Sequence, residues 1–225
     1  MKYLIPVLLA VLLISCNRPL PKAERVIPQT IPAPKVVSPS YAKLINVYVP
    51  LKLDTLEVFS FHNLDSIDYK YKGTQLDSAN AKVLGGNWQN IEYYYANFKF
   101  DIDEHKVGLI TRVPSMYESS SITLFIYDKN KQTITGHFEL AQSWGDAGAV
   151  FEKRSWLFRD KQGNLNCLLH QSYYYDPKVN DEDASTAVDE NNYYLINLQQ
   201  SITDTVDRHA KALFTKTKSW KTKVY

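Results

Sequence analysis

The chain of 225 residues has only two cysteines and eight glycines. Two cysteines exclude a multi-disulfide framework, and so few glycines disfavour the glycine-rich loops that cradle phosphates in nucleotide-binding folds. The motifs G-x-S-x-G, H-E-x-x-H and C-x-x-C are absent, which disfavours the common serine hydrolases, zinc proteases and thiol oxidoreductases. Catalytic groups can still converge from distant strands, so an enzyme is disfavoured and not excluded.

An excess of charge of one sign is also missing. Lysine and arginine total 26 against 24 aspartate and glutamate, a net charge of +2. Such a balance gives no global attraction to a polyanion, so we expect no nucleic-acid partner. Hydrophobic residues at 44% and charged residues at 22% are typical of a soluble globular body.

The N-terminus has the pattern of an export signal. Lys2 is followed by an apolar stretch from Leu4 to Ile14, which is shorter than the roughly 20 residues of a membrane-spanning helix. The stretch ends in Leu13-Ile14-Ser15-Cys16. This sequence resembles the lipobox of bacterial lipoproteins, and residues 1–15 are then the signal peptide. The alternative is an ordinary secretory signal with an incidental Cys16, but no A-x-A-like cleavage site precedes that cysteine.

The resemblance implies covalent lipid on Cys16. Diacylglycerol would be joined to the sulfur, the chain cut before this residue, and the new amino group acylated, for instance with palmitate. Buried acyl chains contribute about 0.8 kcal/mol per methylene, so two or three chains would hold the protein at the membrane permanently. We expect no other cofactor. The expected location is the cell envelope, with the outer membrane favoured over the inner because Asn17 follows the cysteine where some bacteria use Asp for retention.

Residues 16–40 are expected to form a stalk behind the lipidated cysteine. Six of the ten prolines lie between Pro19 and Pro39. Proline fixes φ and removes a backbone donor, which favours extended polyproline geometry at about 3.1 Å per residue. The segment is therefore interpreted as a spacer between the membrane and the globular body.

Residues 41–225 are predicted to form a single β-rich globular domain. Tyrosine, phenylalanine, valine, isoleucine and threonine are frequent there, in stretches of about ten residues separated by turn residues. The expected strands are Leu56–Phe61, Asn90–Ile102, Lys106–Val113, Ser121–Tyr127, Thr133–Leu140, Phe151–Arg159, Leu165–Tyr174 and Asn192–Leu198. Little helix is expected: a turn at Ser78–Val83 and a short amphipathic helix at Asp204–Phe214. The predicted fold is mostly β, an antiparallel meander that forms a sandwich, an open barrel or a curved sheet.

The second cysteine, Cys167, is predicted to be a core residue. Three positions separate it from His170, and side chains three apart on a strand point to opposite faces. The two should therefore not form a thiol–imidazole pair.

Two aromatic features are candidate binding elements. Trp144 and Asp146 lie in the segment Ser143–Gly148, interpreted as a loop between two strands. The run Tyr173, Tyr174 and Tyr175 should present rings on both faces of a strand, and such rings can anchor a protein interface or stack on sugars. The alternatives are that Trp144 covers the end of the core and that the tyrosines are ordinary residues of a half-exposed sheet.

Acidic clusters give only weak metal candidates. Asp176, Asp181 and Asp183 lie in an expected long loop that runs to Asp189, and Asp101, Asp103 and Glu104 lie at a strand end. Neither cluster has the spacing of a calcium-binding loop, and solvated loops explain both.

The function expected from these observations is that of a membrane-anchored envelope lipoprotein acting as a non-catalytic binding or accessory module. Its partner would be an envelope protein or a glycan. The alternative is an envelope enzyme that acts on glycans through paired carboxylates, with Asp146 and Glu152 as acid and base. A third possibility is a purely structural envelope component, which would need neither an aromatic binding surface nor paired carboxylates.

Overall fold

The computed structural model describes residues 41–60, 70–84, 93–115, 121–180, 187–199, 208–217 and 220. All of them belong to one compact unit, Pro39–Tyr225. The expected signal peptide, Cys16 and the proline-rich stalk lie outside the described residues.

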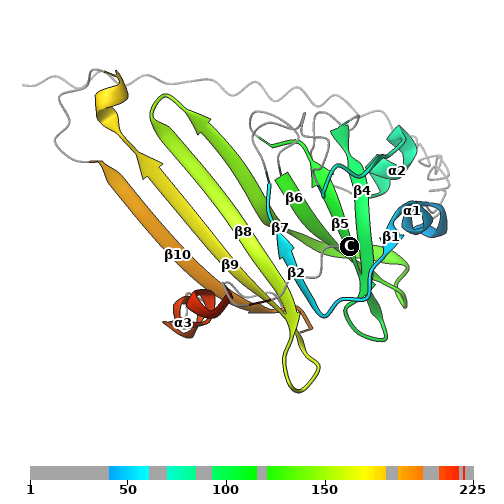
Figure 1. Cartoon of the computed structure of the whole chain (residues 1–225). Coiled ribbons are helices and arrows are strands. Elements are labelled where there is room, and N and C mark those ends of the chain that lie inside the picture. Colours follow the sequence, from blue (N-terminus) through cyan, green and yellow to red (C-terminus); the bar gives the residue numbers. More distant parts are fainter. Residues whose placement is uncertain are drawn as a thin grey trace, which may run out of the picture. The chain divides into compact units, whose positions relative to one another are not determined.

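The described residues form a mostly β structure built on one open sheet (Figure 1). Its strands are β1 (Val49–Pro50), β2 (Thr55–Val58), β3 (Thr74–Gln75), β4 (Tyr95–Asp101), β5 (Lys106–Val113), β6 (Ser121–Asp128), β7 (Thr133–Asp146), β8 (Ala149–Arg159), β9 (Leu165–Tyr175) and β10 (Val188–Asn197). Strands β4 to β10 follow one another as antiparallel neighbours. The predicted antiparallel meander is confirmed, with a parallel β1–β4 pair as the exception.

Strand β7 joins the two parts of the sheet (Figure 1). Its residues 133–141 pair with β6 and its residues 142–146 pair with β8. The register shifts twice along the β6–β7 ladder, and such irregularities bend a strand. The remainder of β8 pairs with β2, from Thr55 opposite Phe158 to Val58 opposite Ser155. One sheet therefore continues from β4–β6 through β7 into β8–β10.

The central core lies on one face of both parts of the sheet. It contains residues from β2, β4 to β10 and the neighbouring segments, among them Leu56, Ile110, Leu124, Leu157, Cys167 and Ile196. Strand β6 is buried on both faces, because Ile122 and Leu124 enter the central core while Phe125 and Tyr127 enter a second cluster. This double burial explains why the strand is a continuous apolar run without alternation.

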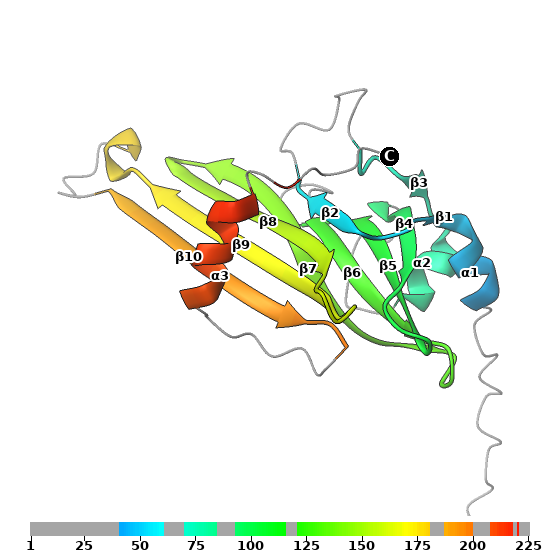
Figure 2. The ribbon, with the colours of Figure 1, turned by 60° about the horizontal axis from the view of Figure 1, so that its bottom comes forward.

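In the described part of the chain, helices pack against the side of the sheet that faces away from the central core. Helices α1 (Tyr41–Val47) and α2 (Ser78–Val83) contribute to the second cluster against β4–β6. Helix α3 (Arg208–Thr217) lies against β9 and β10 at the other end of the sheet (Figure 2). There it forms a third cluster with β8, β9 and β10. Among the described residues, no helix is long and apolar enough to cross a membrane.

Cys167 and His170 lie on opposite faces of β9, as predicted. Cys167 is fully buried in the central core. His170 packs on the other face, against Tyr193 of β10 and Phe214 of α3. The register of the strand therefore excludes a cysteine–histidine pair at these positions.

The expected elements differ from the observed ones mainly at their ends. The turn predicted at Ser78–Val83 is a short helix, α2, over the same residues, and α3 begins at Arg208 inside the range expected from Asp204. The strand expected to end at Leu140 continues to Asp146, and the last strand begins at Val188 instead of Asn192. Helix α1 was not predicted, because its seven residues include Ile45 and Val47, whose β-branched side chains favour strands.

Two aspartates organise hairpin turns. Asp128 accepts hydrogen bonds at Oδ1 from the backbone N–H groups of Asn130 and Lys131, each at 2.9 Å. Asp160 accepts in the same way from Gln162 and Asn164. These bonds lower the pKa of both carboxyl groups, the backbone bond from Lys131 being the largest cause for Asp128 and the side-chain bond from Asn164 for Asp160. The turns therefore form as expected from aspartate bonding to its own backbone.

The buried tyrosines Tyr48 and Tyr94 lead us to expect that the free energy of unfolding falls at alkaline pH. Burial raises the pKa of Tyr48, although a 2.7 Å hydrogen bond with Thr111 partly opposes this effect, and burial also raises the pKa of Tyr94. Unfolded tyrosine ionises near pH 10. Stability is therefore complete below about pH 10 and falls as the pH rises toward the higher folded values, by about 1.4 kcal/mol per pH unit for each phenol.

We expect Tyr48→Phe to make this alkaline decline shallower, because the variant has one buried phenol fewer. Urea titrations of both proteins at a series of pH values above 9 would measure the free energy of unfolding. Equal slopes for the two proteins would contradict the prediction.

Candidate binding site

One row of side chains across the sheet carries three aromatic rings. Trp144 of β7 lies opposite Phe151 of β8, which in turn lies opposite Tyr173 of β9. Trp144 and Phe151 are stacked, with ring centroids 5.5 Å apart and planes inclined by 14°. Trp144 and Tyr173 are 6.4 Å apart. We call these three residues the aromatic shelf.

A polar row separates the aromatic shelf from the central core. It consists of residues on β7, β8, β9 and β10: Gln142, Lys153, Gln171 and Asn192. Lys153 forms a 2.6 Å ion pair with Glu139, and its ammonium lies 5.8 Å from the centre of the Phe151 ring. The shelf rings belong to none of the three hydrophobic clusters of the described residues. Among the described residues, the shelf rings are thus set apart from the buried clusters by one row of polar side chains.

The aromatic shelf has the properties of a recognition surface. Its three rings are partly exposed, and the same row ends in the exposed carboxylate-bearing residue Glu190 on β10. Large rings with two side-chain torsions lose little conformational entropy on binding and contribute strongly to interfaces. The shelf can therefore bind an apolar or ring-bearing partner.

The tyrosine run divides between the two faces of β9, as predicted from the two-residue period of a strand. Tyr173 and Tyr175 share the face of the aromatic shelf, since they pair with Phe151 and Ala149. Tyr174 points to the opposite face and is 42% exposed. The three candidate residues therefore cannot form one surface.

The expected loop at Ser143–Gly148 is wrong. Strand β7 includes Trp144 and Asp146, and only Ala147 and Gly148 turn the chain into β8. Both turn residues have positive φ, 45° and 83°, as a tight two-residue hairpin requires. The strand continues because pairing with β8 satisfies its backbone groups, despite Gly145 and Asp146, whose residue types are depleted in strands.

The proposed acid and base are not a pair. Asp146 pairs with Ala149 and shares the shelf face, whereas Glu152 pairs with Ser143 on the other face. Successive residues of a strand point to opposite sides, so a glycosidic bond could not contact both carboxylates. This part of the enzyme hypothesis is wrong.

The described part of the acidic segment after β9 has regular local structure. Asp176 donates its backbone N–H to the carbonyl of Gly148 at 3.0 Å, and its carboxylate accepts from the N–H of Lys178. A short 3-10 helix follows at Pro177–Asn180, and Asp189 belongs to β10. The weak metal candidates Asp181 and Asp183 lie outside the described residues. Within those residues, no group of three or more histidine, cysteine, aspartate or glutamate side chains could hold a metal ion.

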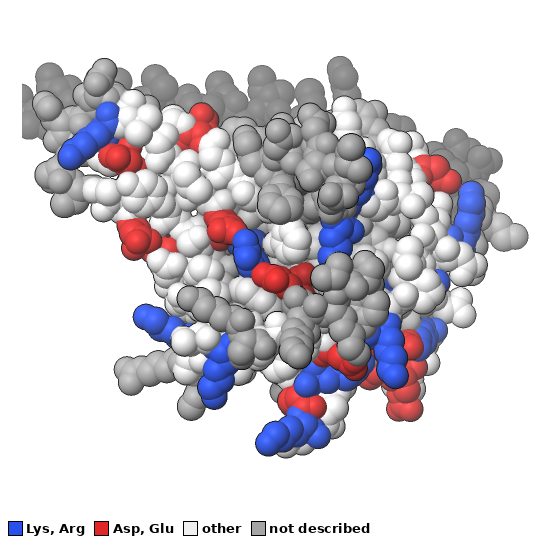
Figure 3. Space-filling model, in the orientation of Figure 1, with Lys and Arg blue, Asp and Glu red and all other residues white. Residues whose placement is uncertain are grey.

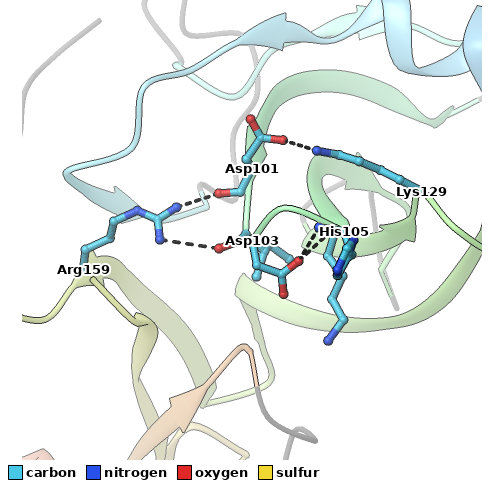
Figure 4. A network of polar contacts seen from close by, with 7 residues as sticks. Asp101, Asp103, His105, Lys129 and Arg159 are labelled. Carbon is cyan, nitrogen blue, oxygen red and sulfur yellow. Dashed lines mark hydrogen bonds and ion pairs between the residues drawn. The ribbon is translucent and has the colours of Figure 1, made fainter. Parts of the chain in front are cut away.

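The second acidic cluster is part of a polar network at one end of the sheet (Figure 4). Asp101 forms a 2.8 Å ion pair with Lys129, and its carbonyl accepts from Arg159. Asp103 accepts hydrogen bonds at Oδ1 from the backbone N–H groups of His105 and Lys106, both at 2.8 Å. These carboxylates hold turns of β4–β5 and β6–β7 together and do not converge on a common point.

The opposite face of β8 and β9 has a pocket that the sequence analysis missed. Arg154 of β8 forms ion pairs with Glu57 of β2 at 3.2 Å and with Glu152 at 2.7 Å. These three residues, together with Trp156, His170, Phe214, Thr217 and Trp220, line a cavity of about 410 Å³, which we call the outer pocket. Glu57 joins Arg154 only because β2 pairs with β8, a contact between distant segments that no local sequence pattern indicates.

Charges of both signs are intermixed on the surface seen in Figure 3. On this face, the lysine and arginine side chains of the described residues lie among aspartates and glutamates, without a large area of one sign. The balance in the sequence thus extends to the visible surface.

Comparison of the chain with models of known protein families, with curated proteins and with solved structures gave no significant match.

Proposed function

We propose that this chain is a lipid-anchored protein of the bacterial cell envelope whose globular part is a non-catalytic binding or accessory module. Cys16 would carry the lipid, and residues 16–40 would space the globular part from the membrane. The aromatic shelf would bind an envelope partner. The observation that carries this proposal is that three partly exposed rings form one row outside every hydrophobic cluster of the described residues.

The surroundings of the aromatic shelf favour binding over catalysis. Lys153, whose ammonium lies 5.8 Å from the centre of the Phe151 ring, is paired with Glu139 at 2.6 Å. Ser121 also donates a hydrogen bond to the second oxygen of Glu139. A carboxylate with both oxygens engaged in this way is poorly placed to exchange a proton with a substrate.

The alternative of an envelope enzyme acting on glycans now depends on Glu57 and Glu152 in the outer pocket. A glycosidase needs open space between its two carboxylates for the scissile bond and, in inverting enzymes, for a water molecule. Here Arg154 forms ion pairs with both carboxylates and so lies between them. This arrangement favours a binding role for that pocket as well.

In-cell crosslinking of the tagged full-length chain, followed by mass spectrometry, tests the proposal. We expect one envelope protein to be captured repeatedly, and capture to fall about tenfold or more in Trp144→Ala and Tyr173→Ala, because truncation of a central interface ring costs about 2 kcal/mol or more. Tyr174→Ala is the matched control, because this neighbour on the same strand is exposed on the other face. It should retain capture.

Equal capture by the wild type and both shelf variants would show that the partner binds elsewhere. A loss confined to Tyr174→Ala would assign the interface to the opposite face of β9 and would overturn the role of the aromatic shelf.

A further inference from the structure

The outer pocket has an aromatic wall supplied by two segments distant in the sequence. Trp156 of β8 contacts Phe214 of α3 edge-on, with ring centroids 5.4 Å apart. Trp220 packs against Phe158 at 5.0 Å, and its backbone N–H donates to the carbonyl of Thr217 at the end of α3. This turn brings a third ring to the cavity. Trp156, Phe214 and Trp220 all line it, so a ligand would meet a large apolar contact area.

The other wall of the outer pocket is polar. In the contacts among the described residues, Arg154 engages one oxygen of Glu57 and one oxygen of Glu152. A carboxylate can accept several hydrogen bonds, and a guanidinium has five N–H donors. The side chains of Glu57, Glu152 and Arg154 are 26%, 45% and 39% exposed. The triad is therefore accessible, and it can both accept and donate hydrogen bonds to a ligand.

The charged side chains of the polar wall are already paired with one another. The two carboxylates that line the pocket, Glu57 and Glu152, share the guanidinium of Arg154. An ionic ligand would have to compete with these ion pairs, whereas a neutral ligand with many hydroxyl groups can form hydrogen bonds alongside them.

His170 adds a polar group whose ring is held in place. It stacks on Tyr193, with centroids 4.7 Å apart and planes inclined by 19°. Its Nε2 lies 2.9 Å from Oδ1 of Asn191, and Nδ2 of Asn191 donates to Asp189 at 2.9 Å. The His170 ring is held by stacking on Tyr193 and by its hydrogen bond with Asn191, which is itself held by Asp189. Such a ring loses little conformational entropy when a ligand binds.

We propose that the outer pocket is a binding site for a neutral saccharide of one or two rings. A pyranose ring has an apolar C–H face, which suits the aromatic wall, and hydroxyl groups that both donate and accept, which suit the carboxylate–guanidinium wall. The cavity of about 410 Å³ is within the range of roughly 300–1,000 Å³ for small-ligand sites. The site is distinct from the aromatic shelf, because it lies on the other face of β8 and β9.

Saturation-transfer NMR on the full-length chain in detergent micelles tests this proposal. The neutral probes are maltose, cellobiose and N,N′-diacetylchitobiose, and the charged probes are glucosamine and glucuronate. We expect transfer to at least one neutral disaccharide. Its affinity should fall about tenfold or more in Glu152→Gln, which keeps the shape of the side chain but loses a charged acceptor. It should fall about as much in Trp220→Ala, which removes a ring from the wall.

Trp144→Ala is the control, because it alters the aromatic shelf alone, and it should retain saccharide binding. Unchanged melting temperatures would show that the variants are folded. The proposal is overturned if no neutral disaccharide receives transfer, if only a charged sugar does, or if folded Glu152→Gln and Trp220→Ala bind as well as the wild type. Because partner capture depends on the other face of the sheet, either proposal can fail while the other holds.

Discussion

Replacement of Cys16 by serine is expected to abolish fatty-acid incorporation into this protein. The lipobox resemblance implies a thioether on the sulfur of Cys16, and a serine hydroxyl cannot form that bond. Metabolic labelling with an alkyne-tagged palmitate, followed by immunoprecipitation, would measure the incorporation. We expect strong labelling of the wild type and only background labelling of Cys16→Ser.

The chain supplies its own control for this experiment in Cys167, the other of its two cysteines. Cys167 is fully buried in the central core, so it should not be acylated in the folded protein, and Cys167→Ser should incorporate as much label as the wild type. If Cys16→Ser still carries palmitate, the lipoprotein interpretation is wrong. If the wild type carries none, the N-terminus is an ordinary secretory signal.

The variant Gly148→Ala is expected to lower the free energy of unfolding by about 3 kcal/mol. Gly148 has φ of +83°, where an alanine costs about 1–2 kcal/mol. A Cβ atom there would also lie 2.5 Å from the carbonyl oxygen of Asp176 and 3.1 Å from Cβ of Val179. Relief of that overlap requires the backbone to shift, at a cost of about 1–3 kcal/mol more.

Alanine variants of two other glycines distinguish the cost of the positive φ from the cost of the steric overlap. Gly163 has φ of +84°, but a Cβ there would have no atom within 4 Å, so Gly163→Ala should cost about 1 kcal/mol from the backbone alone. Gly136 has neither a positive φ nor a close neighbour, and an alanine in this strand should be neutral or stabilise by up to about 1 kcal/mol. Urea titrations of the three variants would give the order. Equal losses for Gly148→Ala and Gly163→Ala would show that the β7–β8 turn does not contact the segment at Asp176.

The sequence predicted the strands well wherever the residue types agree with the fold. Residues 122–127 are apolar or β-branched throughout, and the strand predicted at Ser121–Tyr127 forms β6 with only Asp128 added. The prediction failed where pairing with another strand decides the secondary structure. The segment 143–146 contains glycine and aspartate, which are typical of loops, yet hydrogen bonding to β8 extends it into a strand.

The candidate site was predictable only in part for a similar reason. The period of two residues in a strand is enough to place Tyr173 and Tyr174 on opposite faces. The row that unites Tyr173 with Phe151 and Trp144 depends on the register of three strands. The turns at Ala147–Gly148 and at Asp160–Asn164 fix this register, and composition does not show it. The outer pocket could not be predicted from the sequence, because its Glu57 comes from β2, which is distant in the chain from β8 and β9.

The pairing of β2 with β8 also has a consequence for the order of assembly. Synthesis delivers the N-terminal strands first, yet β1 finds its partner only when β4 has appeared, and β2 must wait until β8 has left the ribosome. Strands β4 to β10 can instead form step by step, since each follows its neighbour along the chain. We therefore expect the hairpins to nucleate folding and the N-terminal strands to dock last. Until then, the apolar side chains of β2 are exposed to any chaperone that accompanies the nascent chain.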